Sequence, residues 1–279
     1  MRPLLIYLCV TATLSCARAS TIPAPVVDSP LPALVLRALQ PELFAAPNSF
    51  VNALADVDGD GDPDLFVGFN GTTNKLYRND GGRFVDIAAE SGVADARPTR
   101  AAAFGDWDAD GDPDLLVGFA PGAGPVLRLY RNDGGRFTDA TESAGLAVAS
   151  GAVRQPVWVD YDADDDLDLF IAFRDRPNMM LRNESTKLVD VAAEIGLADT
   201  RRSVGAVWAD LDADGDLDVI VGNMDGDANG VFRNDGGRFT DVAELWSRPT
   251  LRMGVPLRRN ARTERISCLQ AMPRSAATV

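Results

Sequence analysis

The sequence has 279 residues but no histidine, only three cysteines and only two lysines. Without an imidazole side chain there is no Ser-His-Asp or Cys-His relay, no histidine general base and no histidine ligand for zinc or iron. Apolar residues make up 46% of the sequence, which argues against a chain that is disordered throughout. We therefore expect a globular protein that lacks the commonest catalytic side chain.

Long apolar runs are also missing. The only sizeable one, at 4–14, follows Arg2 and precedes Ala17-Arg18-Ala19, which fits a small-x-small cleavage site. Because a membrane span needs about 20 apolar residues, we predict no transmembrane segment and interpret residues 1–19 as a secretory signal peptide. A core helix at this end is the alternative. The predicted location is extracellular or periplasmic.

Cysteine usage fits export without disulfides. Cleavage after residue 19 would leave Cys268 as the only cysteine, so no internal disulfide is expected. A bacterial lipoprotein anchored at Cys16 is a minor alternative, because Leu14 is one position away from where a lipidation signal needs it. The Pro-rich stretch that follows the signal peptide, residues 20–44, is predicted to be a linker.

Acidic residues dominate and they are clustered. The formal net charge is −14, which argues against a nucleic-acid partner. Of the 41 acidic residues, 21 lie in four nine-residue stretches, which start 50, 54 and 50 residues apart. The stretches are 56–64 (DVDGDGDPD), 106–114 (DWDADGDPD), 160–168 (DYDADDDLD) and 210–218 (DLDADGDLD).

A second landmark follows each acidic stretch, as in the LYRNDGGRFVD that begins at Leu76. Apolar runs flank each stretch, and Asn79-Asp80-Gly81-Gly82 predicts a tight hairpin turn between two more strands. Four short strands in a repeat of about 50 residues predict an all-β fold, a β-propeller with about four recognisable four-stranded blades, incomplete or truncated. A calcium-binding β-roll is the alternative, but its repeat is about nine residues long. The blades are expected near 51–93, 101–146, 155–197 and 205–245, within a repeat domain at 45–245.

The acidic stretches are predicted to bind Ca²⁺. Alternate carboxylates on a tightly turning loop converge on one point, and a glycine at position 6 allows the sharp turn. One such stretch alone is also typical of a solvated acidic turn, and Mg²⁺ is the alternative ion, although it prefers to keep its waters. An EF-hand needs a glutamate at position 12 between helices, whereas position 12 here is Val or Ile within a strand-like run.

The third stretch departs from this pattern, because Asp165 replaces the position-6 glycine. Aspartate tolerates left-handed backbone geometry better than most residues, but at some cost. We therefore predict that the third site is the weakest of the four.

These motifs resemble the FG-GAP/VCBS repeat family, the calcium-loop blades of integrin α-chain propellers and of many secreted bacterial proteins, over roughly residues 45–245. The resemblance implies that side chains at loop positions 1, 3, 5 and 9 and the carbonyl at position 7 bind Ca²⁺. The residues implied are Asp56, Asp58, Asp60, Asp62, Asp64, Asp106, Asp108, Asp110, Asp112, Asp114, Asp160, Asp162, Asp164, Asp166, Asp168, Asp210, Asp212, Asp214, Asp216 and Asp218.

Two departures from the family pattern concern the ends of the chain. Family propellers usually have about seven blades, so an open or incomplete ring is expected, and the segment 34–50 could supply a closing outer strand. Residues 246–279 hold seven arginines, one glutamate and neither landmark. This segment is predicted to be an irregular basic tail, or a truncated or out-of-frame continuation of a longer repeat protein. Binding of the basic tail to an acidic partner or an anionic surface is the third alternative.

The leading functional hypothesis is a secreted, non-enzymatic calcium-binding repeat protein that acts as a structural, interaction or adhesion module for a protein or carbohydrate ligand. The alternative is a carbohydrate-active propeller enzyme, such as a polysaccharide lyase. Without histidine its base would be a tyrosine, Lys75, Lys187 or a carboxylate outside the loops, and no such cluster stands out. Trp107, Trp158 and Trp208 are predicted to pack between blades, with a ligand platform as the alternative.

Overall fold

The computed structural model describes residues 40, 42–43, 45–122 and 124–246, all of which belong to the compact unit Leu39–Val279. The predicted signal peptide, Cys16, most of the predicted linker and all but the first residue of the predicted basic tail lie outside the described residues. Those predictions stay predictions.

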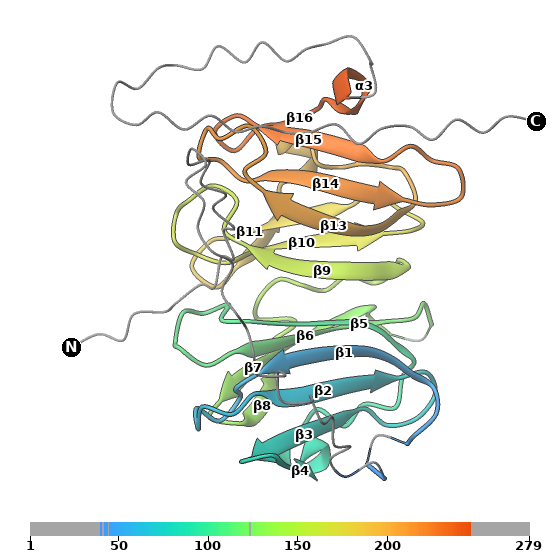
Figure 1. Ribbon diagram of the computed structural model, residues 1–279, viewed down its shortest axis with the longest axis vertical. Helices are drawn as coiled ribbons and strands as arrows, with labels where there is room; N and C mark the ends of the chain where they lie inside the picture. Colours follow the sequence, from blue (N-terminus) through green and yellow to red (C-terminus); the bar gives the residue numbers. More distant parts are fainter. Residues whose placement is uncertain (1–39, 41, 44, 123, 247–279) are drawn as a thin grey trace, which may run out of the picture. The chain divides into compact units, whose positions relative to one another are not determined.

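The predicted all-β fold is confirmed. The described chain forms four antiparallel sheets of four strands each, in which successive strands are neighbours, and Figure 1 shows them in sequence order from blue to orange. The strands are β1 Ser49–Ala55, β2 Asp64–Phe69, β3 Lys75–Asp80 and β4 Arg83–Asp86; β5 Thr99–Gly105, β6 Asp114–Phe119, β7 Leu127–Asp133 and β8 Arg136–Asp139; β9 Val153–Val159, β10 Asp168–Phe173, β11 Met179–Asn183 and β12 Leu188–Asp190; β13 Ser203–Ala209, β14 Asp218–Asn223, β15 Gly230–Asn234 and β16 Phe239–Asp241.

The apolar runs that flank the acidic stretches form the first two strands of each sheet, as predicted. Three one-turn helices were not predicted: α1 Ala88–Ser91, α2 Ala192–Ile195 and α3 Ala243–Trp246. The first two end at Gly92 and Gly196, which adopt the left-handed conformation with φ of 87° and 92°. None of the helices in the described part of the chain has the length and apolar character needed to cross a bilayer.

Each sheet has two rows of side chains, because directly opposed residues of neighbouring strands share a face. One row faces the next sheet in the chain, and we call it the forward row; the other, the backward row, faces the previous sheet. The forward rows are Ala53, Phe66 and Leu76; Ala103, Leu116 and Leu129; Val157, Phe170 and Met180; Val207, Ile220 and Val231. The backward rows are Leu54, Leu65 and Tyr77; Phe104, Leu115 and Tyr130; Trp158, Leu169 and Leu181; Trp208, Val219 and Phe232.

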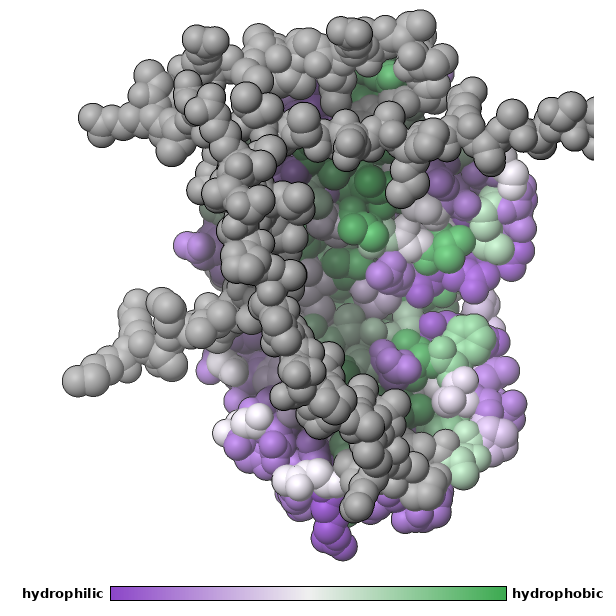
Figure 2. All heavy atoms as spheres, in the orientation of Figure 1, coloured by the Kyte–Doolittle hydropathy of each residue, from purple (hydrophilic) through white to green (hydrophobic). Residues whose placement is uncertain are grey.

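The hydrophobic core lies between sheets, where a forward row meets the following backward row. Phe66 and Leu76 of the first sheet pack in one cluster with Leu115 and Tyr130 of the second. The second and third sheets form a second such cluster, and the third and fourth sheets a third. Figure 2 shows apolar residues in a band that runs across the front of successive sheets, with hydrophilic residues at its margins. Each sheet therefore depends on its neighbour for burial of its apolar side chains.

Tryptophans contribute to these contacts, as the sequence predicted. Trp158 packs on the cluster between the second and third sheets, and a Cβ atom added to Gly105 would lie 2.5 Å from its ring. Trp208 meets Phe170 and Phe239 edge to face, at centroid distances of 5.6 and 5.8 Å. Gly105 is thus required for close approach of two sheets, not for a turn.

The four sheets do not close into a ring, in agreement with an incomplete propeller. The first strands of successive sheets contact one another, β1 with β5, β5 with β9 and β9 with β13, whereas the first and fourth sheets lie at opposite ends of the series (Figure 1). The expected closing strand from segment 34–50 is absent among the described residues. Ser49 and Phe50 instead begin β1, and none of the described residues in 40–48 forms a strand.

Candidate metal centres

The four acidic stretches are the connections between the first and second strands of the four sheets, and their ninth residue begins the second strand. The Asp at position 1 shapes each loop by accepting hydrogen bonds from backbone N–H groups further along it. In the first loop Asp56 accepts from Gly59 at 2.9 Å, Asp60 at 3.1 Å and Gly61 at 2.9 Å. Equivalent bonds form at Asp106, Asp160 and Asp210. The carboxylate thus folds the loop around itself.

Side chains from positions 1, 3 and 9 converge in every loop. In each set one carboxylate oxygen from each residue lies within 4.8 Å of the others. The four sets are Asp56, Asp58 and Asp64; Asp106, Asp108 and Asp114; Asp160, Asp162 and Asp168; Asp210, Asp212 and Asp218. Each set could hold a metal ion, because three hard oxygen donors face a common point.

The side chains at positions 5 and 7 are not part of these sets, although the family resemblance includes both positions. Asp60 accepts the Asp62 N–H at 2.8 Å, and Asp62 accepts the N–H of Gly81 in the hairpin turn at 2.8 Å. The position-7 side chain therefore joins the loop to the hairpin of the same sheet. A metal contact at position 7 would come from its backbone carbonyl.

The Asp at position 9 is buried and holds two parts of the sheet together. Asp64 accepts the Val57 N–H through Oδ2 and the Asn79 N–H through Oδ1, both at 2.8 Å. The same pair of bonds recurs at Asp114, Asp168 and Asp218. Burial raises the pKa of Asp114 and of Asp168 to about 7, although the backbone donors oppose that shift.

Two position-3 carboxylates show that the loops suit a cation. Asp58 Oδ1 and Asp108 Oδ1 are buried and have no hydrogen-bond partner among the described residues. A buried carboxylate oxygen without a partner is costly, and burial raises the pKa of Asp108 accordingly. A divalent cation at the convergence point would supply the missing partner, so these residues fit the ion.

Left-handed backbone occurs at two positions in each loop. At position 6, Gly61, Gly111 and Gly215 have φ between 95° and 104°, and Asp165 follows them with φ of 72°. The requirement inferred for position 6 from the sequence is thus present. The left-handed conformation at position 4 was not predicted. Gly59 has φ of 74° there, and the other three loops have alanines with φ between 56° and 64°, namely Ala109, Ala163 and Ala213.

An asparagine from the next sheet covers each of the first three loops. Asn132, Asn183 and Asn234 donate through Nδ2 to the position-2 carbonyls of Val57, Trp107 and Tyr161, at 2.8, 2.8 and 3.1 Å. These are the asparagines of the second landmark, whose sequence pattern predicts only a hairpin turn. Their fixed place after each acidic stretch was the signal that could have identified them as contacts between repeats.

The third and fourth loops differ from the first two. In the third, the Tyr161 N–H lies 3.4 Å from Asp168, against 2.8 Å for the same contact in the other three loops. Glycine of the hairpin turn donates to position 7 in the other three loops, whereas Ser185 and Thr186 replace the glycines here. In the fourth loop Asp210 and Asp212 are both exposed, and the described part of the chain has no further sheet after this one.

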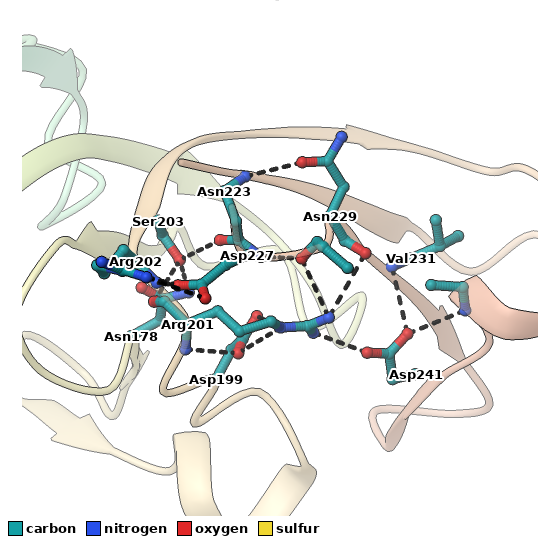
Figure 3. Close-up of polar contacts among 12 residues, drawn as sticks. Asn178, Asp199, Arg201, Arg202, Ser203, Asn223, Asp227, Asn229, Val231 and Asp241 are labelled. Carbon is teal, nitrogen blue, oxygen red and sulfur yellow. Dashed lines mark hydrogen bonds and ion pairs between the residues drawn. The ribbon is translucent and has the colours of Figure 1, made fainter. Parts of the chain in front are cut away.

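A second polar cluster lies between the third and fourth sheets and has a structural explanation (Figure 3). Arg201 donates to Asp199 at 2.8 Å and to Asp241 at 2.7 Å, and Arg202 pairs with Asp227 at 3.0 Å. Between the first and second sheets, Asp95 pairs with Arg97 and Arg128 in the same way. These arginines fasten the segment that precedes a sheet to that sheet, and their acids are not among the convergent sets that could hold a metal.

The lysines considered as bases are engaged elsewhere. Lys75 forms a 2.7 Å ion pair with Asp86, and this hydrogen bond raises the pKa of the lysine. Lys187 donates to the carbonyl of Ser143. A lysine whose pKa is raised stays protonated at neutral pH, which is opposite to what a general base needs.

Comparison with known families agrees with this geometry. The family described as FG-GAP-like repeat matches residues 56–117 and 160–221. Each match runs from position 1 of one acidic loop into the second strand of the next sheet, β6 or β14. The chain therefore contains FG-GAP-like repeats over these two segments. All four acidic loops fall wholly within the matched segments. No curated protein matches the sequence.

Solved structures resemble this chain at low identity. The V. cholerae biofilm matrix protein Bap1 is 15% identical over 69% of this chain and 30% of that chain, with a TM-score of 0.42. BBS1N in complex with ARL6DN, soaked with lead, is 13% identical over 70% and 53%, with a TM-score of 0.44. The exotype rhamnogalacturonan lyase YesX is 14% identical over 63% and 38%, with a TM-score of 0.36. The chain thus spans between 30% and 53% of the length of these structures.

Proposed function

We propose that this protein is an exported, non-enzymatic calcium-binding repeat module, in which Ca²⁺ holds the loops of an interaction or adhesion surface. The observation that carries the proposal is the recurrence of the same three converging carboxylates in all four loops, two of which have a buried oxygen without a hydrogen-bond partner among the described residues. Four copies of one solvated acidic turn would not need such burial.

Calcium suits the sites better than magnesium. Each set consists of oxygen donors only, and the chain has no histidine that would favour a softer metal. Mg²⁺ keeps several waters and needs near-octahedral geometry, whereas Ca²⁺ accepts many protein oxygens in a flexible arrangement. The residues that would hold the ion are those at positions 1, 3 and 9 of each loop, and the ion would neutralise their mutual repulsion.

The ion would also act beyond its own loop. Position 9 binds the backbone of the hairpin in its own sheet, and the carbonyl at position 2 receives the asparagine of the next sheet. A filled loop therefore fixes both contacts, and with them the relative placement of neighbouring sheets. Extracellular calcium modules bind with Kd of about 10⁻⁴ to 10⁻³ M, so such sites fill outside cells and not in cytosol.

The test is a calcium titration of thermal unfolding on protein freed of metal. Each site that fills only in the folded state adds about 2.7 kcal/mol when Ca²⁺ is at 100 times its Kd. The expected result is a large rise in Tm with Ca²⁺ and a smaller one with Mg²⁺ at equal concentration. An unchanged Tm in Ca²⁺ would refute the structural role of the ion.

Export has a separate test. The N-terminal residue of protein recovered from the medium or periplasm should be Ser20, the residue after the predicted cleavage site. A lipidated protein that begins at Cys16, or an intact Met1, would contradict the predicted secretion route. The partner, a protein or carbohydrate ligand, is then sought by affinity capture in millimolar Ca²⁺ and compared with capture in chelator.

A further inference from the structure

The two ends of the row of sheets carry complementary halves of a contact that the chain makes three times internally. On the fourth sheet the forward row has no following sheet: Val207 is 67% exposed, and Ile220 and Val231 are half-buried. In the other three sheets the second- and third-strand residues of this row, such as Phe66 and Leu76, are fully buried, and the first-strand residues, such as Val157, are half-buried. Among the described residues no strand packs on this row, and the one-turn helix α3 contacts its strand β15.

The first sheet presents the opposite half. Its backward row begins with Leu54, which is 64% exposed, and continues with Leu65, which lines an open hollow of about 260 Å³ together with Val67. The corresponding residues of the second sheet, Leu115 and Val117, are fully buried against the first sheet. Large apolar side chains exposed side by side on a sheet usually mark an interface.

The hydrogen bond that an asparagine makes to the preceding sheet also lacks one partner at each of these two ends. Asn183 and Asn234 each donate to two carbonyls, one in their own loop and one in the preceding loop. The equivalent Asn79 donates to the carbonyl of Pro63 in its own loop, at 3.1 Å, and to no other among the described residues. The carbonyl of Leu211, equivalent to those of Val57, Trp107 and Tyr161, accepts no hydrogen bond from the described part of the chain. One end has a spare donor and the other a spare acceptor.

We infer that the fourth sheet of one copy binds the first sheet of a second copy, head to tail. The contact would repeat the three internal ones, with Val207 and Ile220 against Leu54 and Leu65, and with Asn79 donating to Leu211 of the other copy. Two copies joined at both ends would place eight sheets in one ring, a number that propellers adopt. Such a pair has twofold symmetry and leaves neither row open.

The segment before β1 limits the contact without blocking it. The Gln40 side chain pairs with the backbone of Phe84 on β4, and the Leu43 carbonyl accepts from Tyr77. In the third sheet the equivalent backbone site, at Leu188, is met instead by Ala144 of the preceding sheet. Gln40 therefore occupies backbone groups of the outer strand β4. Leu54 and the turn at Asn79 stay accessible to a second copy.

The inference is tested by the mass of the full chain in solution, measured by light scattering or sedimentation at micromolar concentrations in Ca²⁺. The wild-type protein should have twice the protomer mass. Leu54→Glu and Val207→Glu should each give the protomer mass, because both faces occur in every contact. Both residues are mostly exposed, so the variants should fold, which circular dichroism checks. Val189→Glu introduces the same charge at an exposed position of the third sheet and should leave the doubled mass unchanged.

Mixing the two single variants distinguishes this arrangement from other pairings. A Leu54→Glu copy keeps an intact fourth sheet and a Val207→Glu copy keeps an intact first sheet, so an equimolar mixture should regain pairs through one contact. A wild-type protein with the mass of one protomer overturns the inference. So does a result in which Val207→Glu has the protomer mass while Leu54→Glu keeps the doubled mass, because two fourth sheets would then face each other. The inference does not depend on calcium binding, because a protein with a calcium-dependent Tm can be monomeric.

Discussion

Asn132 donates its side-chain N–H to the backbone carbonyl of Val57, 2.8 Å away and 75 residues earlier in the chain. Both groups are buried, and the carbonyl belongs to an acidic loop of the first sheet while the asparagine belongs to a hairpin of the second. This bond connects the candidate metal centre of one sheet to the next sheet. It makes loop geometry and packing between repeats parts of one structure.

Asn183 makes the same bond one sheet further on, to the backbone carbonyl of Trp107. Asn183→Ala should lower the free energy of unfolding by about 1–3 kcal/mol, because the buried carbonyl of Trp107 loses its donor. Asn79→Ala is the matched control, since Asn79 makes the bond within its own loop but none to another sheet of the same copy. Chemical denaturation of dilute protein measures both. Equal losses in the two variants would mean that the contact between sheets contributes nothing.

Asp108→Asn should weaken calcium binding without destabilising the metal-free protein. Without metal the variant should be as stable as the wild type or more stable, because a buried carboxylate oxygen without a partner is replaced by a neutral group. With Ca²⁺ it should lose the contribution of one site, about 2.7 kcal/mol at 100 times Kd. Thermal unfolding with and without Ca²⁺ gives both values. Asp133→Asn, the same charge change at an exposed acid outside the sets, should leave the calcium-dependent gain intact.

The dependence of stability on pH should change direction with calcium. Burial raises the pKa of Asp114 and Asp168 to about 7 in the folded protein, whereas the ordinary value for Asp is 3.8. The metal-free folded state therefore binds more protons than the unfolded state between about pH 4 and 7, so its stability should fall as pH rises through this window.

In Ca²⁺ the ionised carboxylates bind the ion, so the calcium-dependent gain in Tm should be largest at neutral pH and shrink on acidification as protons compete. Thermal unfolding of resin-stripped protein and of the same protein in Ca²⁺, each from pH 4 to 7.5, measures both slopes. A metal-free Tm that rises towards neutral pH would contradict the raised pKa values.

Strain at position 4 should be removable. Ala213 has φ of 64°, which costs an alanine about 1–2 kcal/mol, whereas Gly59 occupies the same position in the first loop. Ala213→Gly should therefore raise the free energy of unfolding by up to about 1.5 kcal/mol, after the entropy cost of glycine of about 0.5–1 kcal/mol. Ala228→Gly, at an exposed residue outside the left-handed region, should instead be neutral or destabilising. A loss of stability in Ala213→Gly would show that the loop is unstrained there.

Much of the fold follows from local pattern. The apolar runs on each side of the acidic stretches become β1 and β2 and their equivalents because turn residues fix where a strand can begin and end. Gly81 and Gly82 both have positive φ, so the hairpin predicted from the Asp-Gly and Gly-Gly steps forms between β3 and β4. The one-turn helices were missed, because four residues are too few for a helical period to appear in the sequence.

The sequence predicted the kind of candidate site, but not which role each of its carboxylates has. Five alternating carboxylates indicate a cation-binding loop, but their spacing alone does not distinguish one carboxylate from another. Only the folded loop gives Asp62 to a hairpin glycine and buries Asp64 between two backbone donors, while Asp58 keeps an oxygen without a partner.

The sequence alone determined that this protein consists of four acidic, strand-flanked repeats, because turn chemistry and apolar alternation act over a few residues. Tertiary structure decided which carboxylates converge, which asparagines cross between repeats and which rows of side chains stay uncovered at Leu54 and Val207. These features depend on how one repeat packs against the next. Residues 75 positions apart meet only when the sheets have come together.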